Sequence, residues 1–548
     1  MNAVLSPPPI WTTTTTEGNR TGTWRASRPW HIVAPSPCHQ ACPVHGDIAS
    51  WIGQAREGDA RGAWLTLVAH NPFPAITGRI CHHPCEAACN RVGVDGALSI
   101  CKLERWVGDQ ALAQGWSLPA AAADSGRRVA VVGAGPSGLS AAWQLRRRGH
   151  AVTLFESRPQ AGGLMRDGIP AYRLSRRVLD AEVDRLLATG IDPRFAAPAP
   201  ALAELQKDFD AVYLATGAAR PKRLPQLDAA SPQVVDGATW LLQANAGAPP
   251  AVGPRVLVIG GGSAAFDAAR SARRHGHAVT LMALEDETWL PAQPDEVDEA
   301  REEGVVVIGG ARLTTVTALE GGRLRIGAER VQAERGRIPP RVTPVEGSAF
   351  TLEVDAIVPS IGADPDLGWL SGVACTGPVL TIDADGATSR PGVWAGGDLA
   401  SMARHVSTAI GMGEAAVLAM HRALGGAMDA PRSSLPALEA AVPLSAISLF
   451  HHPAAARATG RRVDVDARLA HHDEVQLALT DAEALAETQR CFSCGTCTHC
   501  NHCVIYCPDL AVQPDGDSYR VLTDYCKGCG VCVAECPSGS MTMQEEVR

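Results

Sequence analysis

The strongest constraint on this chain is the crowding of its cysteines near one end. Ten of the 17 cysteines lie between residues 491 and 536, in CFSCGTCTHCNHCVIYCP and DYCKGCGVCVAECP. Dense cysteines form disulfides mainly in short secreted chains. This chain has 548 residues, and its opening MNAVLSPPPIWTTTTT lacks the charged and apolar regions expected of a secretory signal. We therefore expect thiolates that bind metal.

Two runs within this segment share one spacing. In each run three cysteines stand three residues apart, and a fourth follows four residues later and precedes proline. This is the spacing of two-cluster bacterial ferredoxins, in which the fourth cysteine of each run binds the other cluster. Zinc ribbons use paired CxxC motifs instead. His499 and His502 lie between these cysteines and can hydrogen-bond the sulfurs. The expected ligands of two 4Fe–4S clusters are Cys497, Cys500, Cys503 and Cys536 for one, and Cys526, Cys529, Cys532 and Cys507 for the other.

A glycine-rich turn follows the strand-like segment RVAVV. The turn contains Gly133, Gly135 and Gly138, and the helical segment LSAAWQLRRRG comes after it. Glycines at this spacing let the backbone approach a pyrophosphate at the N-terminus of the helix. Glu156 ends the next strand, AVTLFE, where a carboxylate can bind ribose hydroxyls. The segment therefore predicts a dinucleotide site.

The same order of elements returns as RVLVIGGGSAAFDAARSARRHGHAVTLMALE. The second turn contains Gly260, Gly262 and Ala265, and Glu285 ends the strand that follows. A carboxylate there bonds the ribose diol and repels a 2′-phosphate, and ALEDETWLPA offers no arginine to receive that phosphate. The sequence predicts NAD(H) rather than NADP(H); the alternative is that Glu285 is a solvated acid at a strand end.

Between residues 128 and 424 the chain holds a single cysteine, Cys375. Flavoenzymes that reduce disulfides need a pair of cysteines beside the flavin. The sequence therefore excludes a thiol relay in this region. We expect Cys375 to be buried as a small apolar side chain.

Further motifs give the two dinucleotide sites a family resemblance. GGLMRDGIPAYRL follows the first site, and GGD occupies residues 396–398. With them, residues 36–425 resemble the FAD- and NAD(P)H-binding small subunit of glutamate synthase and its relatives. The resemblance implies FAD at the first glycine turn and a nicotinamide nucleotide in an inserted domain. In that family two arginines usually stand where this chain has Leu284 and Glu285, which again favours NAD(H). The residues implicated at the flavin site are Gly133, Gly135, Gly138, Glu156, Gly163, Arg173, Gly397 and Asp398.

The N-terminal cysteines carry the same resemblance. PCHQACP, ITGRICHHPCEAACNRVG and ALSICKLER are similar to the helical iron–sulfur domain of that family, which binds two clusters through interleaved ligands. The RCxxC that normally precedes the first motif is missing there, but RCFSCG begins at residue 490. We expect this segment to fold back and complete a cluster; otherwise Cys491 and Cys494 are spare and three clusters form. The expected set is Cys38, Cys89, Cys491 and Cys494.

The second N-terminal set has an open fourth position. Its first three expected ligands are Cys42, Cys81 and Cys85. The family position implies Glu104 as the fourth ligand, whereas thiol chemistry allows Cys101, one helical turn away. Counting favours Cys101, because sixteen cysteines make four complete clusters, and the motif resemblance favours Glu104. Four clusters are expected, and three are the minimum.

These motifs divide the chain into four folded units and two connecting segments. The expected fold is α/β, with two Rossmann-like dinucleotide-binding domains, the NAD domain being inserted in the FAD domain. A helical iron–sulfur domain precedes them and a bacterial-ferredoxin-like α+β domain follows. The expected boundaries are 1–37 for a flexible N-terminal arm, 38–124 for the helical iron–sulfur domain, 125–252 with 366–428 for the FAD-binding domain, 253–365 for the NAD(H)-binding domain, 429–489 for an extended linker and 490–548 for the ferredoxin-like domain.

Composition and charge exclude some classes of function. The apolar fraction is 46%, the charged fraction is 20% and the formal net charge is −9, which excludes a general nucleic-acid binder. We expect no membrane span and a cytoplasmic location. The expected activity is that of an FAD-dependent NAD(P)H:acceptor oxidoreductase that prefers NAD(H) and passes electrons between NAD(H), FAD and 4Fe–4S clusters. Such transfer requires no acid–base pair or nucleophile, and none is expected.

The C-terminal cysteine module indicates which kind of protein complex this chain joins. DYCKGCGVCVAECP resembles the ferredoxin-like delta subunit of 2-oxoacid:ferredoxin oxidoreductases. The resemblance implies a subunit of a 2-oxoacid:acceptor oxidoreductase complex, with other subunits or a ferredoxin as partners. Two alternatives stay open: a glutamate synthase small subunit, and a non-catalytic iron–sulfur scaffold for electron transfer.

Overall fold

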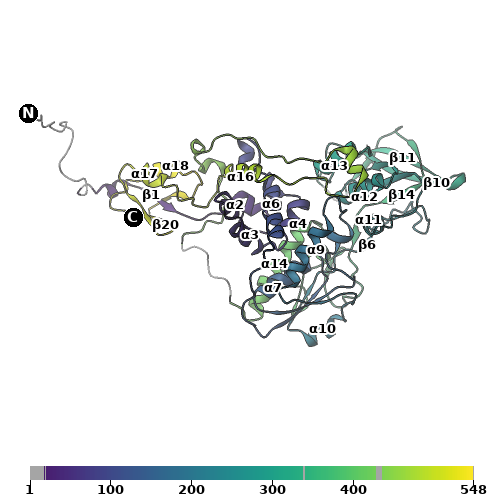
Figure 1. Cartoon of the computed structure of the whole chain (residues 1–548), viewed down its shortest axis with the longest axis horizontal. Coiled ribbons are helices and arrows are strands. Elements are labelled where there is room, and N and C mark those ends of the chain that lie inside the picture. Colours follow the sequence, from purple (N-terminus) through teal and green to yellow (C-terminus); the bar gives the residue numbers. More distant parts are fainter. Residues whose placement is uncertain (1–17, 19, 337–339, 428–434, 547–548) are drawn as a thin grey trace, which may run out of the picture.

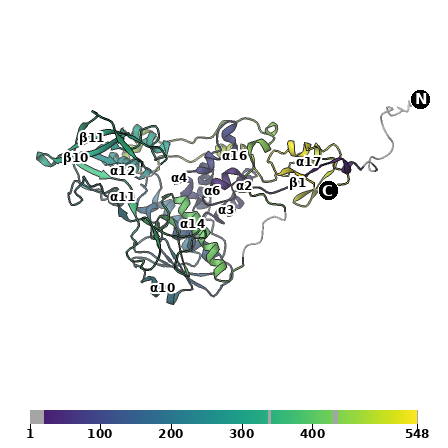
Figure 2. The same cartoon turned by 180° about the vertical axis from the view of Figure 1, so that it is seen from behind.

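The computed structural model describes residues 18, 20–336, 340–427 and 435–546. The chain forms an elongated molecule (Figures 1 and 2). The C-terminal cysteine module lies at one end, and the strand-rich region of residues 255–356 lies at the other. The helices of residues 37–113 lie between them and rest on the first dinucleotide domain.

The N-terminal unit is helical, as predicted. Its core is built from large side chains that are almost wholly buried, such as Trp51, Trp64 and Ile76. Helices α4 and α6 pack very closely, because a Cβ on Gly78 would lie 2.3 Å from the backbone nitrogen of Arg105. The helices are α1 (Pro37–Ala41), α2 (Ile48–Arg56), α3 (Ala60–Val68), α4 (Pro74–Ile80), α5 (Pro84–Ala87), η2 (Asn90–Gly93) and α6 (Ile100–Ala113).

The first dinucleotide domain is a parallel sheet covered by helices. Its strand order is β18-β5-β2-β3-β4, and every pairing is parallel. The strands are β2 (Arg128–Val132), β3 (Ala151–Phe155), β4 (Asp192–Arg194), β5 (Ala211–Leu214) and β18 (Val393–Ala395). The helices and short elements around them are α7 (Pro136–Arg147), α8 (Leu164–Asp167), α9 (Arg176–Leu187), α10 (Leu202–Asp208), β16 (Cys375–Thr376), β17 (Val379–Leu380), η4 (Gly397–Leu399) and α14 (Val406–Ala423).

A second domain of the same kind is inserted between β5 and β18. Its parallel sheet has the order β14-β7-β8-β9, and a separate antiparallel sheet joins β10, β11, β12 and β13. The chain enters and leaves through the short antiparallel pair β6 (Arg220–Pro221) and β15 (Ala363–Asp364). The other elements are β7 (Arg255–Ile259), β8 (Ala278–Met282), β9 (Val306–Ile308), β10 (Ala311–Ala318), η3 (Glu320–Gly322), β11 (Leu324–Ala333), β12 (Val342–Pro344), β13 (Phe350–Val354), β14 (Ala356–Pro359), α11 (Gly237–Asn245), α12 (Ser263–Arg274) and α13 (Pro294–Glu302).

The C-terminal module is completed by the other end of the chain. Strand β21 (Met541–Glu545) pairs antiparallel with β1 (Ser27–His31), and β19 (Val512–Asp515) pairs with β20 (Ser518–Val521). The short helices are η1 (Thr21–Trp24), α17 (His502–Ile505) and α18 (Val531–Ala534). The expected flexible arm over residues 1–37 is therefore wrong for β1; residues 1–17 and 19 lie outside the described residues.

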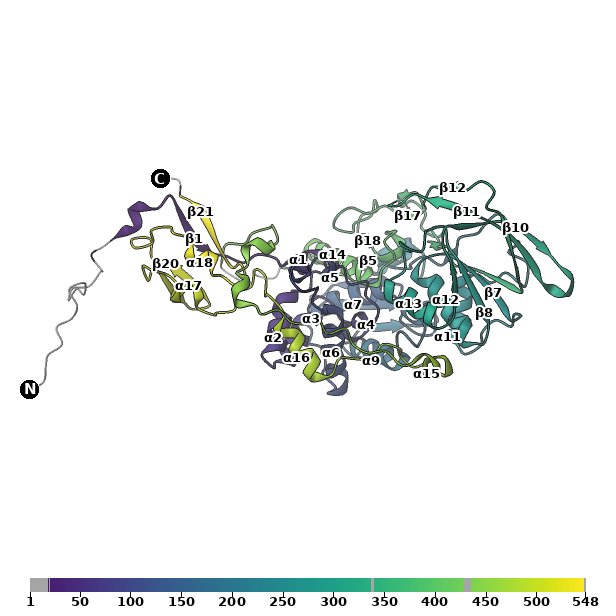
Figure 3. The same ribbon diagram turned by 90° about the horizontal axis from the view of Figure 1, so that it is seen from above.

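The connection over 429–489 is not simply extended. It contains η5 (Leu444–Ala446), η6 (Leu449–His451), α15 (Val465–Ala470) and α16 (Asp481–Gln489), and residues 428–434 lie outside the described part. A capping box formed by Thr480 and Glu483 starts α16, which packs against α2 and α6. Figure 3 shows α15 beside the inserted domain and α16 beside α2. The segment therefore spans the helical unit and reaches the second dinucleotide domain.

Candidate functional site

The first glycine turn has no room for a side chain at Gly133 or at Gly138. Gly133 has a φ of +103°, and a Cβ there would lie 2.4 Å from the carbonyl oxygen of Ala215. A Cβ on Gly138 would lie 1.8 Å from the carbonyl oxygen of Gly133. Gly135 is the N-cap of α7, so the positive end of the helix opens onto the turn. This is the local geometry that a pyrophosphate needs.

Glu156 lies at the end of β3, beside the first glycine turn. Its Oε2 accepts a hydrogen bond from the backbone N–H of Ala134 at 2.8 Å, and its Oε1 accepts one from the backbone N–H of Arg158 at 2.9 Å. These bonds fix the carboxylate against the turn. The hydroxyl of Ser157 also donates to Oε1 at 3.2 Å, whereas Oε2 can accept a further hydrogen bond and so can still receive a ribose hydroxyl.

Two distant segments meet the first glycine turn, as the family resemblance implies for a flavin site. Gly163 has a φ of +50°, and a Cβ on it would lie 2.8 Å from the Cα of Gly135. A Cβ on Gly397 would lie 2.9 Å from the Cβ of Ser137, on the first turn of α7. Asp398 follows Gly397 in η4, and burial raises the pKa of its carboxyl group.

Arg173 has a different environment from the other residues implicated at the flavin site. Its Nη1 lies 2.6 Å from Oδ2 of Asp267 in α12, and its Nη2 also pairs with Glu296 in α13. The guanidinium is thus engaged by two carboxylates of the inserted domain. Arg173 joins the two dinucleotide domains through a buried ion-pair group.

The second glycine turn has the same construction as the first. Gly260 has a φ of +139°, and a Cβ there would lie 2.3 Å from the carbonyl oxygen of Ser360. Gly262 is the N-cap of α12, and Ala265 is fully buried in its first turns. A Cβ on the intervening Gly261 would lie 2.7 Å from Oε2 of Glu285, so that carboxylate lies over the turn.

The structure brings together the four cysteines of the predicted fold-back set. Burial raises the pKa of the Cys38 thiol, and the charges of Cys491, Cys89 and Cys494 raise it further. Burial and the charge of Cys491 also raise the pKa of Cys494 to about 12. The amide of Asn90 donates to the sulfur of Cys494 at 3.4 Å. Residues more than 400 positions apart thus form one thiol group.

The second N-terminal group contains Cys42, Cys81 and Cys85 with both candidates for the fourth position. Burial is the main cause that raises the pKa of Cys81 to about 12, and the charge of Glu104 adds to it. Burial and then the charge of Glu104 raise the pKa of Cys42. Burial is also the main cause that raises the pKa of Cys85, and the charge of Cys101 adds to it. Proximity alone therefore does not choose between Glu104 and Cys101.

Hydrogen bonding separates the two candidates. Oε1 of Glu104 accepts from the amide of Asn71 at 2.7 Å and from the hydroxyl of Thr77 at 2.8 Å, which leaves Oε2 for another partner. The thiol of Cys101 donates instead to the carbonyl oxygen of Thr77 at 3.6 Å. Burial raises the pKa of Glu104 to about 7. Asn71 and Thr77 are supporting residues that sequence reasoning missed, because nothing in their spacing marks them.

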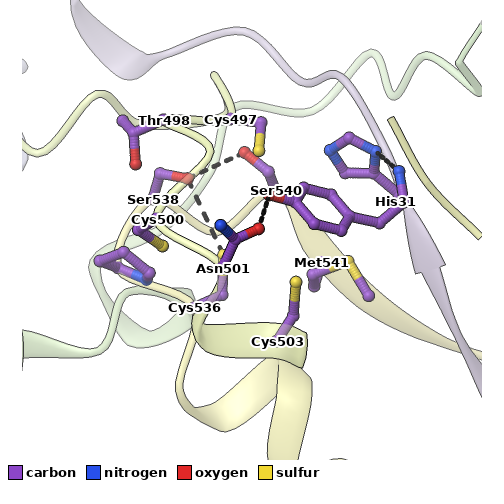
Figure 4. A pocket seen from close by; sticks show the side chains of 12 residues that line it. His31, Cys497, Thr498, Cys500, Asn501, Cys503, Cys536, Ser538, Ser540 and Met541 are labelled. Atoms are coloured by element: carbon purple, nitrogen blue, oxygen red, sulfur yellow. Dashed lines mark hydrogen bonds between the residues drawn. The ribbon is translucent and has the colours of Figure 1, made fainter. Parts of the chain in front are cut away.

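The C-terminal cysteines fall into the two predicted groups. Burial raises the pKa of Cys503 to about 12, and the other three cysteines of its expected set add to this. Burial and then Cys507, Cys526 and Cys529 raise the pKa of Cys532 to about 12. Figure 4 shows the first group around one cavity. The cysteines that line it are Cys497, Cys500, Cys503 and Cys536.

The thiols of these groups are the donors that 4Fe–4S clusters use. Within the part of the chain that the structure describes, no group of three or more His, Cys, Asp or Glu side chains could hold one metal ion. A 4Fe–4S cubane is wider than an ion, so its thiolates need not converge on one point. The cavity of Figure 4, lined by four cysteines, suits the cubane.

Three other predictions can be compared with the structure. Cys375 is exposed, so the expectation that it is buried is wrong; it lies in the exposed hairpin strand β16. His499 is also exposed, and the ring of His502 lies against that of His451, tilted by 43° with 4.0 Å between centroids. Neither histidine lines the cavity of the first C-terminal group, whereas His31 does. No helix among the described residues is long and apolar enough to cross a membrane.

Family models match three parts of the chain. Residues 127–413 match the pyridine nucleotide-disulphide oxidoreductases, residues 16–116 match the 4Fe-4S cluster domain II of dihydropyrimidine dehydrogenase, and residues 519–542 match a 4Fe-4S binding domain. The family name mentions a disulphide, but Cys375 is the single cysteine between residues 128 and 424. The first match covers both dinucleotide domains.

Individual relatives agree with these matches. The beta subunit of the NADP(+)-dependent formate dehydrogenase of Moorella thermoacetica is 34% identical over 72% of this chain, which spans 61% of that relative's length. The NADPH glutamate synthase small chain of Mycobacterium tuberculosis is 35% identical over 72% of this chain and 87% of its own length.

A solved structure of FprA from Mycobacterium tuberculosis with NADPH aligns with 66% of this chain and 99% of its own, at 16% identity and a TM-score of 0.47. The family assignment does not depend on that alignment, because the match to residues 127–413 and the 35% identical relative are sufficient for it. The chain belongs to the pyridine nucleotide-disulphide oxidoreductase family and, within it, to the group of iron–sulfur flavoproteins related to the glutamate synthase small chains.

Proposed function

We propose that this chain is an NAD(H)-dependent FAD and iron–sulfur subunit of a larger oxidoreductase. The observation that carries the proposal is the order of the candidate sites in space. The inserted domain, the first dinucleotide domain, the N-terminal thiol groups and the C-terminal thiol groups follow one another along the molecule (Figures 1 and 3). FAD bound at the first turn would supply the change between two-electron and one-electron transfer.

The residues of the two dinucleotide domains have positioning roles in this proposal. Each glycine turn offers the N-terminus of a helix to a pyrophosphate, α7 in one domain and α12 in the other. The buried group of Arg173, Asp267 and Glu296 ties the domains together and sets their relative orientation. With both cofactors bound, that orientation would position the nicotinamide for transfer to the flavin and help to exclude water.

The proposed preference for NAD(H) depends on Glu285. Its carboxylate lies over the second glycine turn, where it would accept hydrogen bonds from the ribose diol and repel a 2′-phosphate. No ion pair of Glu285 with an arginine or lysine occurs among the described residues. The relatives named for NADPH make the opposite preference the alternative outcome.

The test compares NADH and NADPH as donors to an artificial dye, with the iron- and FAD-loaded full chain. We expect a higher kcat/KM for NADH. The double variant Leu284→Arg with Glu285→Arg should move the ratio toward NADPH by about tenfold or more, because a charge repulsion becomes an ion pair. A wild-type preference for NADPH would contradict the NAD(H) assignment and leave the oxidoreductase proposal intact. Loaded protein that oxidises neither nucleotide would instead support the non-catalytic scaffold.

The partner is a narrower proposal. The segment DYCKGCGVCVAECP supports a 2-oxoacid oxidoreductase as the complex in which this subunit works. Purification of the complex from its native source tests this. We expect NAD(+) reduction that depends on a 2-oxoacid and coenzyme A. Activity that depends on formate or on glutamate would contradict the 2-oxoacid partner and favour complexes like those of the relatives.

A further inference from the structure

One histidine of the N-terminal strand enters the C-terminal module. His31 is the last residue of β1 and lies opposite Met541 of β21. Its side chain is only 5% exposed, and its ring lies edge-on to the ring of Tyr519 with 5.3 Å between centroids. This packing holds the ring in one position. The position is inside a module whose other residues lie almost 500 positions later in the sequence.

The hydrogen bonds of His31 fix its tautomer. The backbone N–H of Tyr519 donates to Nδ1 of His31 at 3.1 Å, so Nδ1 is an acceptor and carries no proton. A neutral imidazole with an unprotonated Nδ1 carries its proton on Nε2. The Nε2–H of His31 is therefore a hydrogen-bond donor.

This donor has no partner among the residues that the structure describes. Nε2 of His31 is buried and makes no hydrogen bond to any of them. The residue lines the same cavity as Cys497, Cys500 and Cys536, and Figure 4 shows its ring beside Cys497. A buried N–H group normally has an acceptor, because leaving it unpaired is unfavourable. Thiolate and sulfide sulfurs of a cluster in this cavity are the acceptors that the site offers.

We propose that His31 donates its Nε2–H to a sulfur of the 4Fe–4S cluster held by Cys497, Cys500, Cys503 and Cys536, and raises the reduction potential of that cluster. Reduction adds negative charge to the cluster, so a donor to its sulfurs stabilises the reduced form. His31 is thus a positioning and tuning residue that the N-terminal strand supplies to a cluster bound almost 500 residues later. The inference depends on the proposed function only because it requires a cluster in this cavity.

The experiment measures cluster potentials in the full chain. Iron content is determined first for wild type and for His31→Phe, which keeps an aromatic ring and removes the donor. Potentiometric titration followed by EPR then compares the reduction potential of each cluster in the two proteins. We expect His31→Phe to lower the electron affinity of one cluster by about tenfold, which is about 59 mV for a one-electron couple. The affected signal should be the one that Cys500→Ala alters.

Two further measurements separate tuning from a structural role. His31→Gln keeps an N–H donor and should recover part of the shift. Protein labelled with 15N-histidine should show a nitrogen coupling on the reduced cluster that His31→Phe removes. Full iron content with an unchanged potential and no such coupling would overturn the proposal for His31. Wild-type protein without iron would instead overturn the proposed function.

Discussion

The two iron–sulfur regions at opposite ends of this chain are incomplete in different ways. The N-terminal helical unit holds Cys38 and Cys89, and the other two thiols of that group, Cys491 and Cys494, come from the C-terminal part of the chain. The C-terminal module holds all of its own cysteines, but one strand of it, β1, comes from the N-terminus. The N-terminal unit thus receives two ligands from the other end of the chain, and the C-terminal module receives a strand and its buried histidine.

This difference predicts different responses to damage. A cluster that loses two of its four ligands cannot be held, so the loss is all-or-none. A module that loses an edge strand keeps its ligands and loses stability by degrees. These two contributions, of Cys491 and Cys494 to the N-terminal unit and of β1 to the C-terminal module, are called the two exchanges below. They also join the chain ends, and the ion pair of Arg25 with Glu546 at 2.7 Å strengthens this link.

The largest effect is expected from removing the ligands supplied by the C-terminal part. The double variant Cys491→Ser with Cys494→Ser should lose one cluster, so iron should fall from about sixteen to about twelve atoms per chain. The C-terminal clusters should keep their EPR signals, since their thiols are untouched. Iron analysis with EPR measures both.

Cys375→Ser is the matched control for that variant. This cysteine is exposed and lies outside every thiol group, so its loss should leave the iron content unchanged. If wild-type protein already contains about twelve iron atoms, and the double variant the same number, the fold-back cluster does not form.

The next effect concerns the fourth ligand of the second N-terminal group. Glu104→Ala should change this cluster to a form with fewer irons or lose it, because the carboxylate with one oxygen held by Asn71 and Thr77 is removed. Cys101→Ala should leave the iron content unchanged, because that thiol hydrogen-bonds to a backbone carbonyl. Mössbauer spectra distinguish the cluster types. The reverse pattern would assign the position to Cys101.

A graded effect is expected from removing the strand that the N-terminus supplies. Deleting residues 1–31 removes β1 and its pairing with β21, so that the edge of β21 becomes exposed. The C-terminal clusters should still form but bleach at a temperature lower by several degrees. Thermal loss of visible absorbance, with separate EPR quantification, measures this.

Deleting residues 1–17 is the control, because it leaves β1 in place. If the longer deletion removed C-terminal iron completely, β1 would be required for ligand binding, and the contrast between the two regions would fail.

Sequence spacing predicted the glycine turns and the grouping of the cysteines well, because both depend on short-range geometry. A turn such as that at Gly133 permits one backbone path, and ligands three residues apart lie on one side of a cluster. The fold-back group was predictable because the RCxxC motif was missing at one end and present at the other.

The pairing of β1 with β21 was not predictable from the same sequence. SRPWH is five residues long and contains a proline, so it has little of the alternation that marks a strand. Its partner lies more than 500 residues away, and the pairing depends on where the folded helical unit places residue 37. For the same reason nothing in the sequence marks His31, whereas His499 and His502 are near the ligands in sequence.

The smallest effect is expected at Gly495, where the two exchanges meet. Its N–H donates to the carbonyl oxygen of Ser538 at 2.7 Å, and its carbonyl accepts from the N–H of Ala34 at 3.3 Å. Its φ is +72°, and a Cβ would lie 2.0 Å from the carbonyl oxygen of Ala34. Gly495→Ala should therefore cost about 2–4 kcal/mol of stability from backbone strain and overpacking.

Because Gly495 contacts both chain ends, that cost should appear in both regions. The thermal midpoints of the N-terminal and C-terminal clusters should fall together in Gly495→Ala, with the iron content unchanged. Gly516→Ala is the control: its φ is +60° with nothing within 4 Å of its Cβ position, so it carries the strain of the backbone without the clash. A fall confined to one region would mean that the two exchanges are independent, and that the chain ends stabilise each module separately.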